Sequence, residues 1–312
     1  SKQGKRIRLI RRIKQIAAIL LIPLIAGSVF LFMVEKKEIS PLATDIIPGK
    51  ECAVLEMADG RKVELGLGKN LGQLQLEGTV VTNDSNRLAY KQNHSGNSST
   101  LEYNTIIIPR GGEYQLILSD GSRVWLNSDT RLRYPVSFIG EKREVYLEGE
   151  AYFEVTKDVS RPFFVVMKDM ETEVLGTSFE VNTYGDHGEI YMALVEGCVR
   201  VRSGNHVVVA KPNEQVALDL ESRKISTKEV DAARLVAWKD GVLMIKNEPF
   251  VDVIRKLERW FGVEIENQCL ESSALLFSGV FERSGLEVVL QTICANLNIN
   301  YVIDGNRVIL KN

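Results

Sequence analysis

The residues of this chain that could do chemistry are few and lie far apart. Its three histidines are His94, His187 and His206. We find none of the spacings GxSxG, HExxH or a P-loop, which would place a nucleophile, a pair of metal ligands or a phosphate. Glu148, Glu150 and Glu154 imitate a carboxylate pair, but alternate positions of a strand usually form one solvated face. The sequence therefore predicts a protein that is not an enzyme and needs no cofactor or metal.

Cysteine and tryptophan residues give two further hypotheses. The four cysteines are Cys52, Cys198, Cys269 and Cys294, without metal-type spacing. An oxidising compartment would permit a bridge between any two, although the apolar surroundings of Cys294 favour a buried free thiol. The three tryptophans are Trp125, Trp238 and Trp260. They would suit a sugar-binding surface or ordinary core and inter-domain packing.

The N-terminal region has the pattern of a membrane span. Residues 16–34 contain no ionisable side chain, and residues 2–14 contain seven Lys and Arg and no acid. As a helix the apolar run is roughly 28 Å long, close to the thickness of a bilayer. We expect the basic flank in the cytoplasm and the later residues in the periplasm, so the protein would be a single-pass protein of the inner membrane. The predicted anchor residues are Ile16, Leu20, Leu24, Leu31 and Val34.

A cleaved signal peptide is the alternative interpretation of this region. It also has a basic start and an apolar stretch, and Ala26, Gly27 and Ser28 resemble a cleavage site. The apolar run continues to Val34, which is longer than the apolar core of most signal peptides.

Residues 50–228 have the pattern of strands. From Val145 to Val155 apolar and polar residues alternate, which is the period of a half-buried antiparallel strand. Asp-Gly pairs at 59–60, 120–121, 240–241 and 304–305 lie between apolar runs and predict hairpins with type I′ turns.

The last part of the chain changes to short strands with two helices. Residues 250–261 and 286–297 have helical apolar stripes, and each is flanked by strand-like segments. The predicted fold class is a single transmembrane helix, an all-β antiparallel sandwich-like domain, and a small α+β domain of repeated βαβ units. The predicted parts are a basic flank (1–14), the membrane helix (15–35), a hairpin and linker region (36–105), a β domain (106–228) and a C-terminal α+β domain (235–312).

Several motifs together resemble a known family. PRGGEYQLILSDGSRVWLNS at 109–128, REVYLEGEAYFEV at 143–155, VLGTSFEV at 174–181 and LVEGCVRV at 194–201 are similar to the FecR family of membrane-anchored anti-sigma regulators. Residues 238–265 and the segments FSGVF and INYVIDGNRVILKN are similar to the C-terminal domain found with FecR in Bacteroidetes.

The resemblance implies a function and partners. A TonB-dependent outer-membrane transporter would present its periplasmic signalling domain to the C-terminal domain, and proteolysis would then free an extracytoplasmic-function sigma factor. The sigma factor would be bound by a domain upstream of these residues. A net charge of -2 gives no reason to expect nucleic acid as a partner. The alternative from another class is a membrane-tethered glycan-binding β-sandwich protein, motivated by the tryptophans.

The resemblance also implies a candidate for self-cleavage, at Gly176–Thr177. Some members of the family cut themselves at a Gly-Thr bond. A Thr hydroxyl held against the preceding carbonyl can attack it and form an ester that water opens. The alternative is an ordinary Gly-Thr step at the start of a strand.

The predicted partner-binding residues are Phe277, Ser278, Gly279 and Phe281. A Gly within a strand often marks the close approach of another backbone, and a strand at a sheet edge can receive a strand from a partner. In the alternative, both phenylalanines pack on the helices of their own domain.

Overall fold

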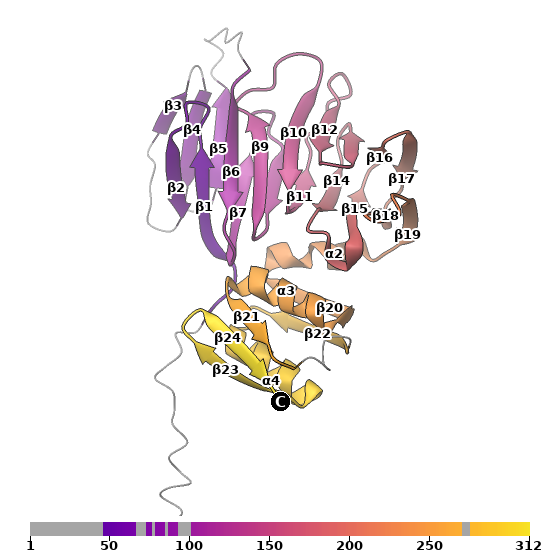
Figure 1. Cartoon of the computed structure of the whole chain (residues 1–312). Helices are drawn as coiled ribbons and strands as arrows, with labels where there is room; N and C mark the ends of the chain where they lie inside the picture. The colour runs from indigo at the N-terminus through magenta and orange to yellow at the C-terminus, as the bar shows by residue number, and fades with distance from the viewer. Residues whose placement is uncertain (1–45, 67–72, 77–78, 85–86, 93–100, 270–274) are drawn as a thin grey trace, which may run out of the picture. The chain divides into compact units, whose positions relative to one another are not determined.

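The computed structural model describes residues 46–66, 73–76, 79–84, 87–92, 101–269 and 275–312 (Figure 1). The chain divides into two compact units, Ser1–Thr44 and Asp45–Asn312. All described residues belong to the second unit, which contains a strand-rich region and, after it, a C-terminal module with two long helices.

The strand-rich region is one connected network of hydrogen-bonded strands. Among the described residues its strands are β1 (Lys50–Glu56), β2 (Lys62–Gly66), β3 (Gln73–Leu76), β4 (Thr79–Asp84), β5 (Arg87–Gln92), β6 (Tyr103–Ile108), β7 (Gly112–Ile117), β8 (Arg123–Leu126), β9 (Thr130–Pro135), β10 (Arg143–Glu148), β11 (Glu150–Glu154), β12 (Phe163–Val166), β13 (Glu171–Val174), β14 (Ser178–Asn182), β15 (Glu189–Glu196), β16 (Val199–Ser203), β17 (His206–Ala210), β18 (Glu214–Asp219) and β19 (Ile225–Glu229). Most neighbours are antiparallel, but β1–β7, β5–β7 and β10–β12 are parallel.

Two Asp-Gly hairpins of this region share one turn geometry. In β1–β2 the amide of Met57 donates to the carbonyl of Arg61, and in β7–β8 Leu118 donates to Ser122 in the same way. Only the glycine of each turn has a positive φ, +84° for both Gly60 and Gly121. The predicted type I′ turn is therefore wrong, since it needs two positive φ values; the geometry fits the longer turn with a left-handed glycine.

The predicted strand over Val145–Val155 is two strands. Gly149 has a φ of +107°, and a Cβ there would lie 2.5 Å from Oγ1 of Thr130. The break lets β10 pair with β9 and β12, while β11 pairs with β8 and β14. The alternation of apolar residues continues through the break because both strands face the same core. Buried side chains from both runs of strands, such as Leu147, Phe153 and Phe163, form that core.

The C-terminal module surrounds a second core, which also includes Tyr152 of β11. Its elements are α2 (Ala232–Leu235), η2 (Val236–Asp240), β20 (Val242–Pro249), α3 (Phe250–Phe261), β21 (Glu264–Asn267), β22 (Leu276–Glu282), α4 (Leu286–Leu297), β23 (Asn300–Asp304) and β24 (Arg307–Lys311). Apolar faces of α3 and α4, with Leu257 and Leu290 among them, pack on two small sheets. Gly262 ends α3 in the left-handed conformation expected after the last helical residue.

The predicted fold class is wrong and is corrected on three points. Within the described residues, no helix has the length and apolar character needed to cross a bilayer; the predicted anchor residues lie in 1–45, outside that part of the chain. The strands form one connected network with parallel pairs, not a purely antiparallel sandwich. The module contains no repeated βαβ unit among its described strands, because β20 pairs with β22 in one sheet whereas β21 pairs with β24 in the other.

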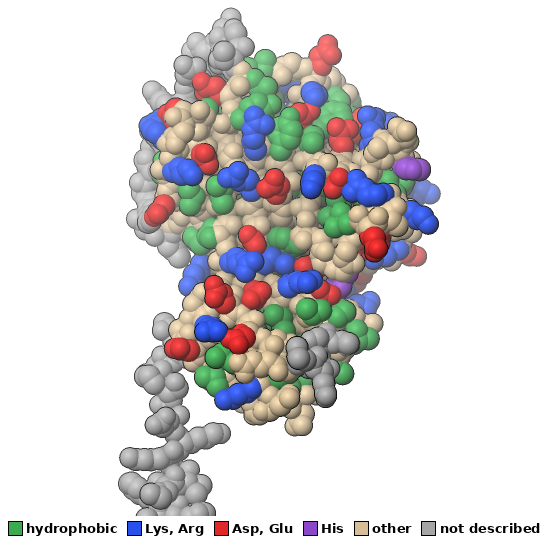
Figure 2. All heavy atoms as spheres, in the orientation of Figure 1, with side chains coloured by type: hydrophobic (Ala, Val, Ile, Leu, Met, Phe, Trp, Pro, Cys, Tyr) green, Lys and Arg blue, Asp and Glu red, His purple; other side chains and the backbone are tan. Residues whose placement is uncertain are grey.

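Charged side chains are distributed over the surface without separation by sign. On the face drawn in Figure 2, Lys and Arg alternate with Asp and Glu. This distribution agrees with the net charge of -2 and offers no basic patch on that face.

Candidate functional site

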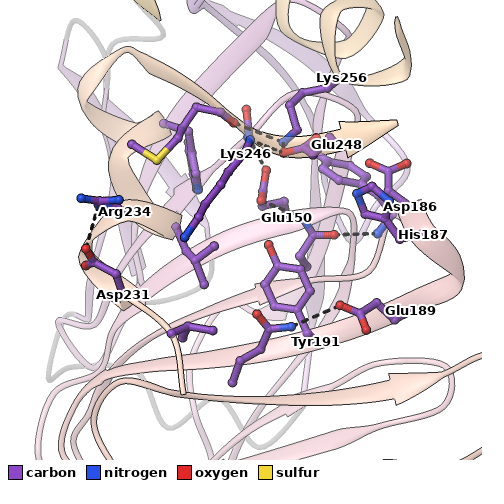
Figure 3. Close-up of a pocket in the computed structure, with 18 of the residues that line it drawn as sticks. Glu150, Asp186, His187, Glu189, Tyr191, Asp231, Arg234, Lys246, Glu248 and Lys256 are labelled. Carbon is purple, nitrogen blue, oxygen red and sulfur yellow. Dashed lines mark hydrogen bonds and ion pairs between the residues drawn. The ribbon is translucent and has the colours of Figure 1, made fainter. Parts of the chain in front are cut away.

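A cavity of about 940 Å³ lies where the strand-rich region meets the C-terminal module. Strands β11, β14, β15, β18 and β19 supply one wall, and α2, η2, β20 and α3 supply the other. Figure 3 shows Glu150 and Tyr191 on the first wall and Lys246, Glu248 and Lys256 on the second. The size is within the range of small-molecule sites, which makes this cavity the candidate functional site.

Opposite charges on the cavity wall are paired with each other. Nζ of Lys256 lies 2.6 Å from Oε1 of Glu248 (Figure 3). Nζ of Lys228 lies 3.2 Å from Oε1 of Glu189. Two further pairs are Arg234–Asp231, at 2.8 Å, and Arg259–Asp186. The wall therefore carries many charged groups but little uncompensated charge.

Two carboxyl groups are buried at the floor of the cavity and beneath it. Glu150 accepts hydrogen bonds from the side-chain amides of Asn127 and Asn182, the second at 2.7 Å. Glu180 is fully buried, and Nε1 of Trp238 donates to its Oε1 at 3.3 Å. Burial, and then the charge of Glu150, raises the pKa of Glu180 well above its usual range. The fold therefore favours the neutral, protonated form of Glu180.

Arg259 of α3 connects the module to the strand-rich region. Its guanidinium contacts Asp186 and lies 4.0 Å from the ring centre of Tyr184. Its carbonyl accepts a hydrogen bond from the amide of Gly111 at 2.7 Å. Gly111 and Gly262 approach so closely that a Cβ on Gly262 would lie 2.8 Å from the carbonyl oxygen of Arg110. Glycine at both positions permits this backbone contact.

A second connection uses the segment that precedes β1, residues 46–50. The amide of Leu286, the first residue of α4, donates to the carbonyl of Ile46 at 3.0 Å. The side chain of Ile46 is half-buried against the core of the module. The amide of Lys50 donates to the carbonyl of Gly111 at 2.9 Å. We call residues 46–50 the strap, because the module holds one end and the strand-rich region the other.

The predicted partner-binding residues all lie on β22. Phe277 and Phe281 are buried in the core of the module, with stacked rings 6.5 Å apart. Oγ of Ser278 accepts from the amide of Asn247 at 2.8 Å. A Cβ on Gly279 would lie 2.9 Å from the ring of Phe277. Leu276 and Val280 of β22 are exposed, and partner binding by this strand stays a prediction.

Gly176 and Thr177 lie between β13 and β14. Thr177 is buried, and its hydroxyl donates to the carbonyl of Cys198 at 3.2 Å. A Cβ on Gly176 would lie 2.6 Å from Cα of Lys157. Nδ1 of His187, ten residues after Thr177, is 2.7 Å from Oδ2 of Asp252 in the module. Self-cleavage stays a prediction, and an intact chain after long incubation of the purified protein would exclude it.

Sequence reasoning did not find the cavity as a site. It singled out Trp238 and Trp260, and both line the cavity, whereas Trp125 packs against Tyr152 at 5.5 Å. The alternating pattern did not predict that Glu150 and Glu180 are buried, because position in a strand does not say which face of the strand contacts a second module. The described residues contain no cluster of three or more metal ligands.

Comparison with known proteins identifies the family. The family described as FecR protein matches residues 104–200, and the domain described as FecR, C-terminal matches residues 242–310. Two crystal structures of a candidate anti-sigma factor from Parabacteroides distasonis ATCC 8503, at 1.65 and 2.50 Å, are each 32% identical to this chain. They cover 67% of this chain and 98% and 99% of their own, with TM-scores of 0.62 and 0.63. No curated protein matches the chain.

These matches together define a class of regulatory protein. The chain belongs to the FecR family of anti-sigma factors. It is therefore a regulator of sigma-factor signalling.

Proposed function

We propose that residues 46–312 are the sensing part of this regulator. The C-terminal module receives a signal from the periplasmic signalling domain of a TonB-dependent outer-membrane transporter. Proteolysis of the regulator then frees an extracytoplasmic-function sigma factor. The observation that carries the proposal is the strap, because the module holds the residues that lead to the N-terminal part of the chain.

The strap offers a short route for the signal. Ile46 contacts the start of α4, and Lys50 is joined through Gly111 to the end of α3. A partner that moves either helix end would act directly on residues 46–50, without rearranging the strand-rich region. Proteases cut extended, accessible chain, so a strap held by hydrogen bonds resists cleavage until it is released.

Adjacent isoleucines provide a matched test. Ile46 packs against the module, whereas Ile47 is 56% exposed. We expect Ile46→Asp to detach the strap, since a carboxylate pays a desolvation penalty in an apolar contact. A reporter gene that depends on the sigma factor should then rise about fivefold or more without inducer, a change in free energy of about 1 kcal/mol. Ile47→Asp should leave the reporter near the wild-type level.

Two controls make the comparison decisive. Both variants should keep the circular dichroism of the wild type and unfold within a few degrees of it. Immunoblots should show cleavage near the strap for Ile46→Asp alone. Equal reporter levels for the two folded variants would reject the strap as the element that transmits the signal.

We also propose that residues 46–312 lie in the periplasm. The thiol of Cys198 is exposed and supports a direct measurement. A membrane-impermeant maleimide should label the chain in cells whose outer membrane has been permeabilised, and Cys198→Ser should lose most of that labelling. Labelling that requires lysis of the inner membrane would contradict this location.

A further inference from the structure

The walls of the junction cavity contain hydrogen-bonding groups and aromatic rings in the combination that suits a small polar ligand. Four side-chain amides, two phenols and two indoles line it: Asn127, Asn182, Asn213, Gln215, Tyr184, Tyr191, Trp238 and Trp260. Asn127, Asn182 and Gln215 each donate one amide hydrogen to Glu150 or Glu189. An amide group has a second N–H and two lone pairs on its oxygen, so these side chains can still donate to or accept from ligand hydroxyl groups. Aromatic rings supply flat apolar surface beside a polar atom.

Charge on the walls argues against an ionic ligand. The wall's four ion pairs, described above, hold eight of its charged side chains. His187 contacts Asp252. Glu229 and Lys246 have opposite signs, and Glu150 is held by two amides. Except at Glu150, Glu229 and Lys246, an anion or a cation would have to break one of these pairs, which costs free energy, whereas a neutral ligand would not.

Tyr191 and Glu150 supply fixed polar contacts at the floor of the cavity. Burial raises the pKa of Tyr191 well above its usual range, so its phenol keeps its proton and can donate. Glu150 is 8% exposed, and its carboxylate remains an acceptor. A phenol donor and a carboxyl acceptor that line the same cavity can bind two adjacent hydroxyl groups of one ligand.

We infer that this cavity binds a neutral, hydroxyl-rich ligand of one or two rings, a mono- or disaccharide. The ligand would contact the strand-rich region through Tyr191 and Asn182 and the module through Trp260 and β20. It would bind the assembled junction better than the separated parts, and so stabilise the folded chain in proportion to its concentration. The inference concerns ligand binding by the purified chain and does not depend on the proposed signalling function.

A saccharide panel tests the inference. The probes are glucose, galactose, N-acetylglucosamine, cellobiose, lactose and N,N′-diacetylchitobiose, each added to the full chain up to about 50 mM. Gluconate and glucose 6-phosphate are the charged comparisons. At least one neutral probe should raise the thermal midpoint in a saturable way and change tryptophan fluorescence, because Trp238 and Trp260 lie in the wall. The charged analogues should bind at least about tenfold more weakly.

Matched variants locate the site. Val242 lines the cavity and is half-buried, so Val242→Phe should fill part of it and weaken binding about tenfold or more. Val288 on α4 is 54% exposed and does not line the cavity, so Val288→Phe should bind like the wild type. Tyr191→Phe removes one hydroxyl and should weaken binding about fivefold.

Each other outcome overturns the inference. Absence of binding by all six neutral probes rejects a saccharide site. Binding of the charged probes alone would show that the cavity does not bind a neutral saccharide. Neutral binding that Val242→Phe and Tyr191→Phe leave unchanged places the site outside this cavity.

Discussion

The folded structure raises the pKa of the Glu113 carboxyl group to near neutral pH. Glu113 lies on β7, directly beside Glu51 on β1, and its carboxyl group faces Gly49 of the strap. Burial, and then repulsion by Glu51, raises its pKa to about 7, against the attraction of Arg283. A charge change at Glu113 therefore acts at the place where the strap enters the fold.

Replacing Glu113 should change how stability depends on pH. Because the pKa in the folded state, about 7, is above the ordinary 4.5, the wild type is most stabilised below about pH 4.5 and loses that stability as the pH rises to 7. Glu113→Gln removes this loss. The variant should be more stable than the wild type at about pH 8, by on the order of 2 kcal/mol, and should lose the advantage at about pH 4.

Urea unfolding at the two pH values measures the effect. Glu148→Gln is the matched control, because Glu148 is exposed at the end of β10. A pH dependence for Glu113→Gln that equals that of the wild type would show that Glu113 does not titrate near neutral pH.

Sequence patterns predicted some of these residues and missed others for a physical reason. Trp238 and Trp260 stood out because the chain has only three tryptophans. Ile46, Glu113 and Arg259 have ordinary sequence surroundings, and their importance comes from contacts between segments far apart in the chain. A periodic pattern records which face of an element is buried, but it does not record which other element covers that face.

At the scale of elements, a short sequence segment predicts a helix or a hairpin correctly where that segment alone determines the structure. Residues 250–261 form α3, and Gly262 ends it, as the apolar stripe and the glycine predict. Asp-Gly pairs at 59–60, 120–121 and 304–305 do join paired strands. The pair at 240–241 instead ends η2, with Gly241 in the left-handed conformation. Glycine with positive φ serves both a hairpin and a helix end, so the dipeptide cannot distinguish them.

Strand β22 is the element at which we expect the transporter's signalling domain to dock. Its exposed face carries Val280, which is 57% exposed. We expect Val280→Lys to weaken binding of the purified signalling domain about tenfold or more, because an inserted ammonium group must lose water at an apolar contact. The fold should tolerate the change, since surface substitutions usually alter stability by under about 0.5 kcal/mol.

Val288→Lys on α4 is the matched control for that experiment. Val288 is similarly exposed, at 54%, but lies on a helix. Calorimetry with both variants should show loss of binding for Val280→Lys alone. Wild-type affinity for Val280→Lys would place the docking surface elsewhere. Gly279→Pro is a poor probe, because the rings of Phe277 and Phe281 leave little space beside Gly279.

At the scale of the described fold, two cores meet at one polar junction. The second core includes Tyr152 of the strand-rich region, and Trp125 and Val195 pack against it. Hydrogen bonds and ion pairs cross the same boundary at Trp238, Arg259 and Asp252. The predicted boundary between residues 228 and 235 treats the module as separable. We expect a shared core of this kind to couple the two parts in unfolding.

The Arg259–Asp186 pair provides the test of that coupling. Both side chains are largely buried, 12% and 19% exposed, and the arginine also covers Tyr184. Removing one partner leaves an uncompensated charge in the junction. We expect Arg259→Gln and Asp186→Asn each to destabilise the chain by about 2 kcal/mol, and the double variant to lose less than their sum. The coupling energy should be about 1–3 kcal/mol.

The exposed pair Arg200–Glu173, whose arginine is 52% exposed, is the control cycle within the strand-rich region. Its coupling should stay below about 1 kcal/mol, because water screens it. In the wild type, urea unfolding followed by circular dichroism and by tryptophan fluorescence should give one coincident transition. In Arg259→Gln the fluorescence transition should come first, since Trp238 and Trp260 lie at the junction. Coincident transitions in every variant, with equal coupling for both pairs, would mean that Arg259 does not link the two cores.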